Sequence, residues 1–118
     1  MDLLNFTLFT AGKYWTYDYG NPFIESDFRA IFPLSPYHNL EKRDYPATMV
    51  MTAEFDDRVV PMHSYKYVAR LQEYNTSAAP ILLYNKEWGG HGRTSGSDRE
   101  SSRYVGAYYT FFAQQLGL

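Results

Sequence analysis

Cysteine is absent from the 118 residues, which excludes disulfide bonds and thiolate chemistry. Long apolar runs are absent too, and none approaches the roughly 20 residues that a membrane helix needs. The formal net charge is -2 and no basic cluster occurs, so neither nucleic acid nor a membrane is expected as a partner. The first ten residues lack the basic region and long apolar core of a signal peptide, and we therefore expect a cytoplasmic protein.

The composition is that of a single globular domain. Hydrophobic residues make up 45% of the chain and charged residues 20%, which is typical of a folded protein with one core. Aromatic residues are abundant at 19%, with 12 Tyr and 8 Phe. Large amphipathic rings pack cores, line ligand pockets and form interfaces, and composition alone does not choose among these roles.

Two short apolar runs predict strands buried on both faces. They are Thr48–Ala53 and Ile81–Tyr84, each bounded by turn-forming residues. Helical spacing of apolar residues predicts helices over 26–32, from Pro61 to near Asn75, and from about Ser102 to Leu116. In the last of these, the expected buried stripe consists of Val105, Tyr108, Phe112 and Leu116. Residues 1–22 are expected to be irregular or partly helical, and the glycine-rich residues 86–102 a loop.

The order strand, helix, strand, helix predicts an α/β fold with parallel strands. Open parallel sheets bind ligands at the carboxyl ends of their strands. Asp56, Asp57 and Arg58 follow the first strand, and His91, within Gly89-Gly90-His91-Gly92, follows the second. We therefore expect the acidic loop and the histidine loop to lie at the same edge of the sheet.

An aspartate beside a histidine suggests acid–base chemistry. A carboxylate that accepts the Nδ1 proton fixes the histidine tautomer and stabilises the imidazolium that forms during nucleophilic catalysis. Asp56 and His91 also follow the chain order of the α/β hydrolases, in which the serine comes first, then the acid, then the histidine.

Other interpretations of these residues stay open at this point. An aspartate after a strand is often a turn former, and a histidine between glycines is often an ordinary loop residue. A metal site built from Asp56, Asp57 and His91 ranks lower, because no second histidine or recognisable ligand spacing accompanies them. His38 and His63 are interpreted as structural or solvated.

Several stretches resemble the prolyl oligopeptidase family of serine peptidases, a branch of the α/β hydrolases. YPATMVMTAEFDDRVVPMHSYKYVARLQ resembles the segment around the family's catalytic aspartate. FTAGKYWTYDYGNP resembles the segment that carries an aromatic wall of its proline pocket, LSPYHNL the loop that follows, and GGHG the catalytic histidine loop. The resemblance covers nearly the whole chain, and DDRVVP at this separation from the tryptophan segment is a specific signal.

The resemblance implies a role for seven residues. Asp56 and His91 match the acid and the histidine of the catalytic triad, and Arg58 matches the arginine that holds a substrate carbonyl oxygen. The residues that match the family's proline pocket are Trp15, Tyr19, Val59 and Val60. Asp57 has no matching role and is interpreted as structural. The implied reaction is cleavage after proline in short peptides, with no cofactor and no metal.

The sequence also lacks a Gly-x-Ser-x-Gly elbow, the motif that presents the serine nucleophile. Ser95 follows the histidine and has no strand before it. We therefore interpret residues 1–118 as the carboxyl-terminal part of such a catalytic domain, which would need the missing upstream part as its partner. The alternatives are an inactive truncated homologue that serves as a binding or regulatory module, or a different α/β hydrolase such as an esterase or a peptide macrocyclase.

Two strands form a very small sheet. Parallel strands are normally flanked by further strands, so the sheet is expected to be incomplete and to leave a bare apolar edge. Such an edge invites pairing with another chain. We therefore expect self-association through the exposed edge, unless the N-terminal segment folds back and covers it.

Overall fold

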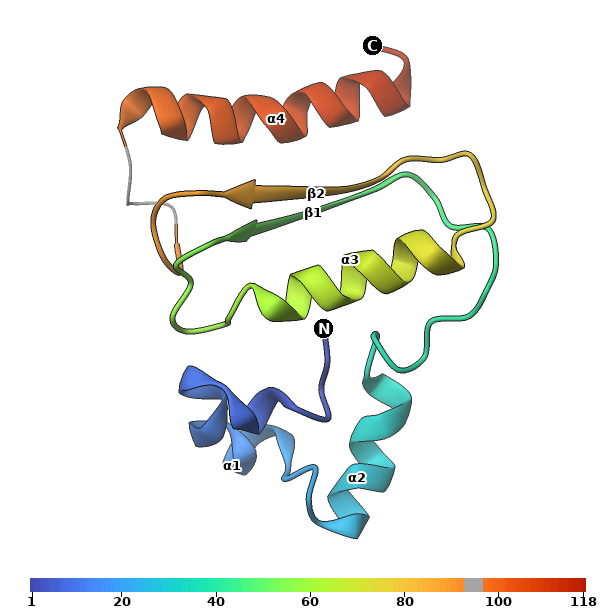
Figure 1. Cartoon of the computed structure of the whole chain (residues 1–118), viewed down its shortest axis with the longest axis vertical. Helices are drawn as coiled ribbons and strands as arrows, with labels where there is room; N and C mark the ends of the chain where they lie inside the picture. The colour runs from blue at the N-terminus through green and yellow to red at the C-terminus, as the bar shows by residue number, and fades with distance from the viewer. Residues whose placement is uncertain (93–96) are drawn as a thin grey trace.

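The computed structural model describes residues 1–92 and 97–118, and it has the expected α/β layering (Figure 1). Strands β1 (Thr48–Ala53) and β2 (Ile81–Lys86) pair in parallel, with Thr48 opposite Ile81 and Ala53 opposite Lys86. Helix α3 (Met62–Tyr74) connects the strands and lies on one side of them, while α4 (Asp98–Leu116) lies on the other. The two strands end side by side, as the sequence predicts.

The main core lies between α3 and the sheet. Val68 and Leu71 of α3 pack with Ile81 of β2 and with Leu40 from the preceding loop. Helix α3 begins directly after Pro61, whose fixed φ suits the start of a helix. Because each of these side chains removes apolar surface from water, the contact holds α3 against the sheet.

Short helical turns make up the N-terminal segment. Phe6–Leu8 and Thr10–Tyr14 are 3-10 helices, and they are followed by α1 (Thr16–Tyr19) and α2 (Glu25–Ile31), after which Phe32–Leu34 forms a further 3-10 turn. Gly12 is required for this packing, because a Cβ atom there would lie 2.0 Å from the carbonyl oxygen of Phe6. The expectation of an irregular, partly helical segment is therefore confirmed.

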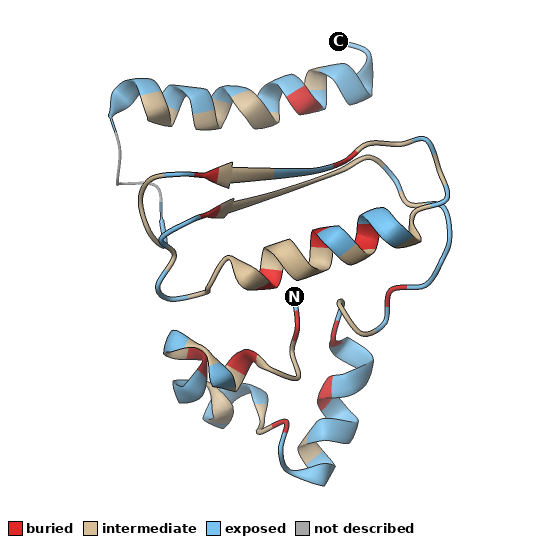
Figure 2. Ribbon diagram, viewed as in Figure 1, coloured by how far each residue is buried: buried red, intermediate tan, exposed pale blue. Residues whose placement is uncertain are grey.

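Three local predictions were wrong. Helix α4 begins at Asp98 instead of Ser102, because Ser97 and Glu100 form a capping box that starts the helix earlier. The buried residue of α4 is Phe111, whereas Phe112 and Leu116 of the predicted stripe are exposed. Figure 2 shows that most of α4 is exposed or intermediate. Strand β2 continues through Asn85 to Lys86, since the ladder with β1 does not depend on apolar side chains.

The strands are also less buried than predicted. Leu82 is 42% exposed and Leu83 37% exposed, so β2 is not covered on both faces. Within the described residues the sheet has only β1 and β2, and each strand therefore has one unpaired edge. No helix in residues 1–92 and 97–118 combines the length and the apolar character needed to cross a membrane.

Candidate active site

Asp56 and His91 are hydrogen-bonded to each other. The Nδ1 atom of His91 lies 2.9 Å from Oδ2 and 3.1 Å from Oδ1 of Asp56. Asp56 follows β1 and His91 follows β2, so the parallel pairing of the two strands brings their loops together. The contact that the sequence predicts between these two side chains is present.

The loop after β1 is organised around the Asp56 carboxylate. Its Oδ1 atom accepts hydrogen bonds from the backbone amides of Val59, at 2.8 Å, and Arg58, at 3.1 Å. The side chain is only 14% exposed. Partial burial alone would raise the pKa of Asp56, but the bonds from the Val59 amide, the His91 ring and the Arg58 amide outweigh it and hold this pKa below its usual value.

An ionised Asp56 determines the tautomer of His91. A carboxylate without a proton can only accept, so the Nδ1 atom of His91 must donate. The Nε2 atom of the neutral ring is then free to take a proton from another group. The His91 side chain is 44% exposed, which leaves the ring accessible. This arrangement suits a general base that is held in place by its acidic partner.

Glycines bring the histidine loop close to the aspartate loop. Gly89 has a φ of 73° and Gly92 a φ of 129°, which side chains rarely adopt. A Cβ atom on Gly90 would lie 3.2 Å from the backbone oxygen of Phe55, next to Asp56. The absence of a side chain at Gly90 therefore lets the two backbones approach closely enough for the Asp56–His91 contact.

A pocket of about 670 Å³ opens beside His91. Five of the seven predicted site residues line it, namely Trp15, Tyr19, Arg58, Val59 and His91. The ring of Trp15 meets that of Tyr19 edge to face, with centroids 6.5 Å apart. Asp56, which is hydrogen-bonded to His91, and the half-buried Val60 do not line the pocket. The substrate-binding roles of these residues stay predictions.

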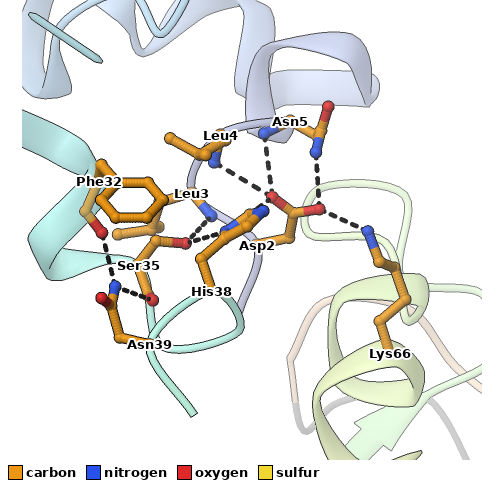
Figure 3. Close-up of polar contacts among 9 residues, drawn as sticks. All are labelled: Asp2, Leu3, Leu4, Asn5, Phe32, Ser35, His38, Asn39 and Lys66. Carbon is orange, nitrogen blue, oxygen red and sulfur yellow. Dashed lines mark hydrogen bonds and ion pairs between the residues drawn. The ribbon is translucent and has the colours of Figure 1, made fainter. Parts of the chain in front are cut away.

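Sequence reasoning missed Asp2, a buried carboxylate that lines the same pocket. Figure 3 shows its polar contacts. It accepts hydrogen bonds from the amides of Leu4 and Asn5, from the Asn5 side chain, and from Lys66 of α3, whose Nζ lies 2.5 Å away. Burial would raise the pKa of Asp2, but Lys66 and Asn5 outweigh this and lower it. Asp2 thus fastens the segment that carries Trp15 and Tyr19 to α3.

Two further histidines lie near this network. His38 is structural, as expected, because its Nδ1 lies 2.8 Å from the Ser35 hydroxyl, which also accepts from the Leu3 amide (Figure 3). His63 is buried, lines the pocket and packs edge to face on Phe9. Burial lowers the pKa of His63 and favours its neutral form. Both histidines were predicted to be structural or solvated. His38 is structural, and His63 is buried, so it is not solvated.

Ser95 lies outside the described residues. Within residues 1–92 and 97–118, no group of three or more His, Asp or Glu side chains is placed to hold a metal ion.

Known proteins are similar to this chain over its whole length. The profile of the prolyl oligopeptidase family matches residues 1–118. The chain is 48% identical to the dual function macrocyclase-peptidase POPB of Amanita bisporigera and 34% identical to the prolyl endopeptidase of Dictyostelium discoideum. These alignments cover 99% and 100% of this chain and 16% of each relative, so the chain spans about a sixth of their length.

A solved structure shows the same fold. Prolyl oligopeptidase B from Galerina marginata, bound to a 35mer hydrolysis and macrocyclization substrate, matches 99% of this chain and 16% of its own length. The TM-score is 0.88 and the sequence identity 40%. The likeness confirms the predicted fold class, a portion of an α/β-hydrolase fold with an incomplete sheet. Because the family profile matches the entire sequence, the chain belongs to the prolyl oligopeptidase family.

Proposed function

We propose that this chain supplies the acid–base pair and part of the proline pocket of a serine peptidase that cleaves after proline in short peptides. The observation that carries the proposal is the hydrogen bond between Asp56 and His91 beside a pocket lined by Trp15 and Arg58. In this proposal residues 1–118 are the carboxyl-terminal part of a cytoplasmic enzyme's catalytic domain, and the serine comes from another part of that domain.

Each residue then has a defined task. His91 takes the proton of the serine hydroxyl through Nε2 and later gives it to the leaving amine, while Asp56 stabilises the imidazolium. The guanidinium of Arg58 holds a substrate carbonyl oxygen, and its fixed planar donors suit that contact. Trp15 and Tyr19 present ring faces and edges to the proline, and Val59 supplies apolar lining, whereas Val60 lies outside the lining of the pocket.

A second candidate, peptide macrocyclisation, is favoured by the names of two relatives. POPB of Amanita bisporigera and of Galerina marginata are described as dual function macrocyclase-peptidases. The same pair of Asp56 and His91 would serve both outcomes, because an acyl-enzyme can pass its acyl group either to water or to the amine of a peptide. A third candidate, an inactive binding module, is favoured by the lack of a Gly-x-Ser-x-Gly elbow in the sequence.

A chimera tests the proposal. The chain would replace the matching segment of Galerina marginata prolyl oligopeptidase B, with which it shares 40% of its residues. We expect the chimera to cleave a chromogenic proline peptide, and Asp56→Asn to lower kcat by about 10⁴, as the same change does in a Ser-His-Asp protease. Asp57→Asn is the matched control, because it removes the neighbouring carboxylate, and it should leave kcat nearly unchanged.

The isolated chain provides the complementary measurement. Without a nucleophile it should not turn over the same peptide, since loss of the triad serine costs about six orders of magnitude in a serine protease. Turnover by the isolated chain, or a folded chimera whose kcat is unaffected by Asp56→Asn, would contradict the proposed role. A folded but inactive chimera that binds the peptide would favour the binding module.

A further inference from the structure

Lys86 is a buried cation next to the histidine loop. It is the last residue of β2, and it is only 5% exposed. Its Nζ atom donates a hydrogen bond to the backbone oxygen of Gly92, at 3.0 Å. The same atom lies 4.6 Å from the ring centroid of Trp88 and 5.6 Å from that of Tyr104 in α4. None of the ion pairs found in the described part of the chain includes Lys86.

The environment of Lys86 is unusual for an ammonium group. A buried charge is costly unless hydrogen bonds or opposite charges compensate it. Among residues 1–92 and 97–118, the compensation comes from one carbonyl oxygen and two aromatic rings, whose electron-rich faces attract cations. The bond to Gly92 is therefore a charge-assisted bond in a place with little water, where it is stronger than an exposed one.

Lys86 contacts both loops of the candidate active site. Through its backbone it pairs with Ala53, and its carbonyl oxygen accepts from the Glu54 amide at 2.8 Å, just before Asp56. Through its side chain it holds Gly92, the residue directly after His91. One residue thus connects the strand that leads to Asp56 with the loop that carries His91.

The histidine loop needs an anchor of this kind. Gly89 and Gly92 have positive φ values, and glycine loses more conformational freedom on folding than any other residue. A loop flanked by glycines does not hold a side chain in one orientation by itself. The bond from the Lys86 ammonium to the Gly92 carbonyl restricts the loop directly after His91. Directly before His91, Gly90 packs beside the Phe55 carbonyl.

We propose that Lys86 is a positioning residue for His91: its ammonium, held between Trp88 and Tyr104, fixes the Gly92 carbonyl and thereby keeps the His91 ring against Asp56. The inference rests on the proposed function, because it gives Lys86 a task in the acid–base pair. It also connects α4 to the site, since Tyr104 belongs to that helix.

The test is nuclear magnetic resonance of the full 118-residue chain with nitrogen-15 in its histidines. In the wild type, His91 should show the Nδ1–H tautomer and a protected ring proton. Lys86→Met fills the same space without a donor or a charge. Loss of a bond donated by a charged group should increase exchange of the His91 ring proton about tenfold to a hundredfold. Lys86→Arg, which can still donate, should restore part of the protection, and Lys42→Met removes an exposed lysine as the matched control.

The outcomes separate the two proposals. If the wild type lacks the Nδ1–H signal, the Asp56–His91 pair fails and so does the proposed function. If the wild type has it and a folded Lys86→Met variant exchanges at the wild-type rate, only the role of Lys86 is overturned. If Lys86→Met does not fold, nitrogen-15 labelling of the lysine Nζ atoms in the wild type decides. A slowly exchanging ammonium signal correlated with the Gly92 carbonyl carbon is expected, and its absence overturns the proposal.

Discussion

Replacing Asp56 by asparagine should destabilise the fold as well as the candidate site. Asp56 accepts two backbone amides in addition to the His91 ring. Asparagine keeps one acceptor oxygen but loses the charge, and a bond to a charged group contributes about 1 kcal/mol more than a neutral one. The Arg58 bond is exposed and counts for less than the part-buried Val59 bond. We therefore expect Asp56→Asn to lower the free energy of unfolding by about 1–2 kcal/mol at pH 7.

The pH dependence provides an internal check of this prediction. Because the pKa of Asp56 is lowered in the folded protein, its contribution is fully present above the ordinary aspartate value of about 3.9. It is lost as the pH falls through the lower folded value, where the wild-type carboxyl becomes protonated and loses its charge. The stability difference between wild type and Asp56→Asn should therefore shrink in acid.

Urea unfolding, followed by tryptophan fluorescence at pH 7 and near pH 3, measures both effects. Asp57→Asn serves as the control, since Asp57 is exposed and a surface change of this kind usually stays within about 0.5 kcal/mol. Equal losses in the two variants, or an Asp56→Asn loss that is as large in acid as at pH 7, would refute the reasoning.

Three other predictions concern the helix start, the buried histidine and the sheet edge. Ser97→Ala removes one half of the α4 capping box and should cost about 1 kcal/mol in urea unfolding, whereas an unchanged midpoint would show that the cap contributes nothing. Burial lowers the pKa of His63, so the stability of the protein should fall as the pH drops below about 6.5. In thermal melts, His63→Phe should make stability depend less on pH. An unchanged pH dependence would mean that other groups cause it. We also propose that the bare sheet edges cause self-association, which light scattering at several concentrations checks, and a concentration-independent monomer with a cooperative melt would contradict it.

The sequence predicted the parts of the fold that depend on local apolar patterns. The runs Thr48–Ala53 and Ile81–Tyr84 are apolar and bounded by turns, so the presence and order of both strands and of the helix between them were predicted correctly, although β2 continues to Lys86. The Asp56–His91 contact followed from the strand order alone, because parallel pairing places both loops at one edge. The pocket walls were assigned from the family resemblance, and no periodicity in the chain would have placed Trp15 beside His91.

The errors occurred where polar residues decide the structure. The early start of α4 was readable from Ser97 and Glu100, whose spacing is that of a capping box, but the glycine-rich context suggested a loop. The choice between Phe111 and Phe112 as the buried ring depends on how α4 rests on a sheet of two strands, which periodicity does not specify. Lys86 and Asp2 were missed because charged residues are rarely buried, and only their partners in space explain them.

The two halves of the candidate site therefore have separate supports. The pair of Asp56 and His91 depends on the β1–β2 ladder and on the Lys86 bond to Gly92. The wall that carries Trp15 and Tyr19 depends on the network around Asp2 and on its bond to Lys66. A bond from the Thr10 hydroxyl to the Arg58 backbone oxygen joins the two halves at 3.1 Å, but it is exposed and contributes little. Substitution of Asp2 should consequently disturb substrate binding more than it disturbs the Asp56–His91 pair. Substitution of Lys86 should disturb the Asp56–His91 pair more than substrate binding.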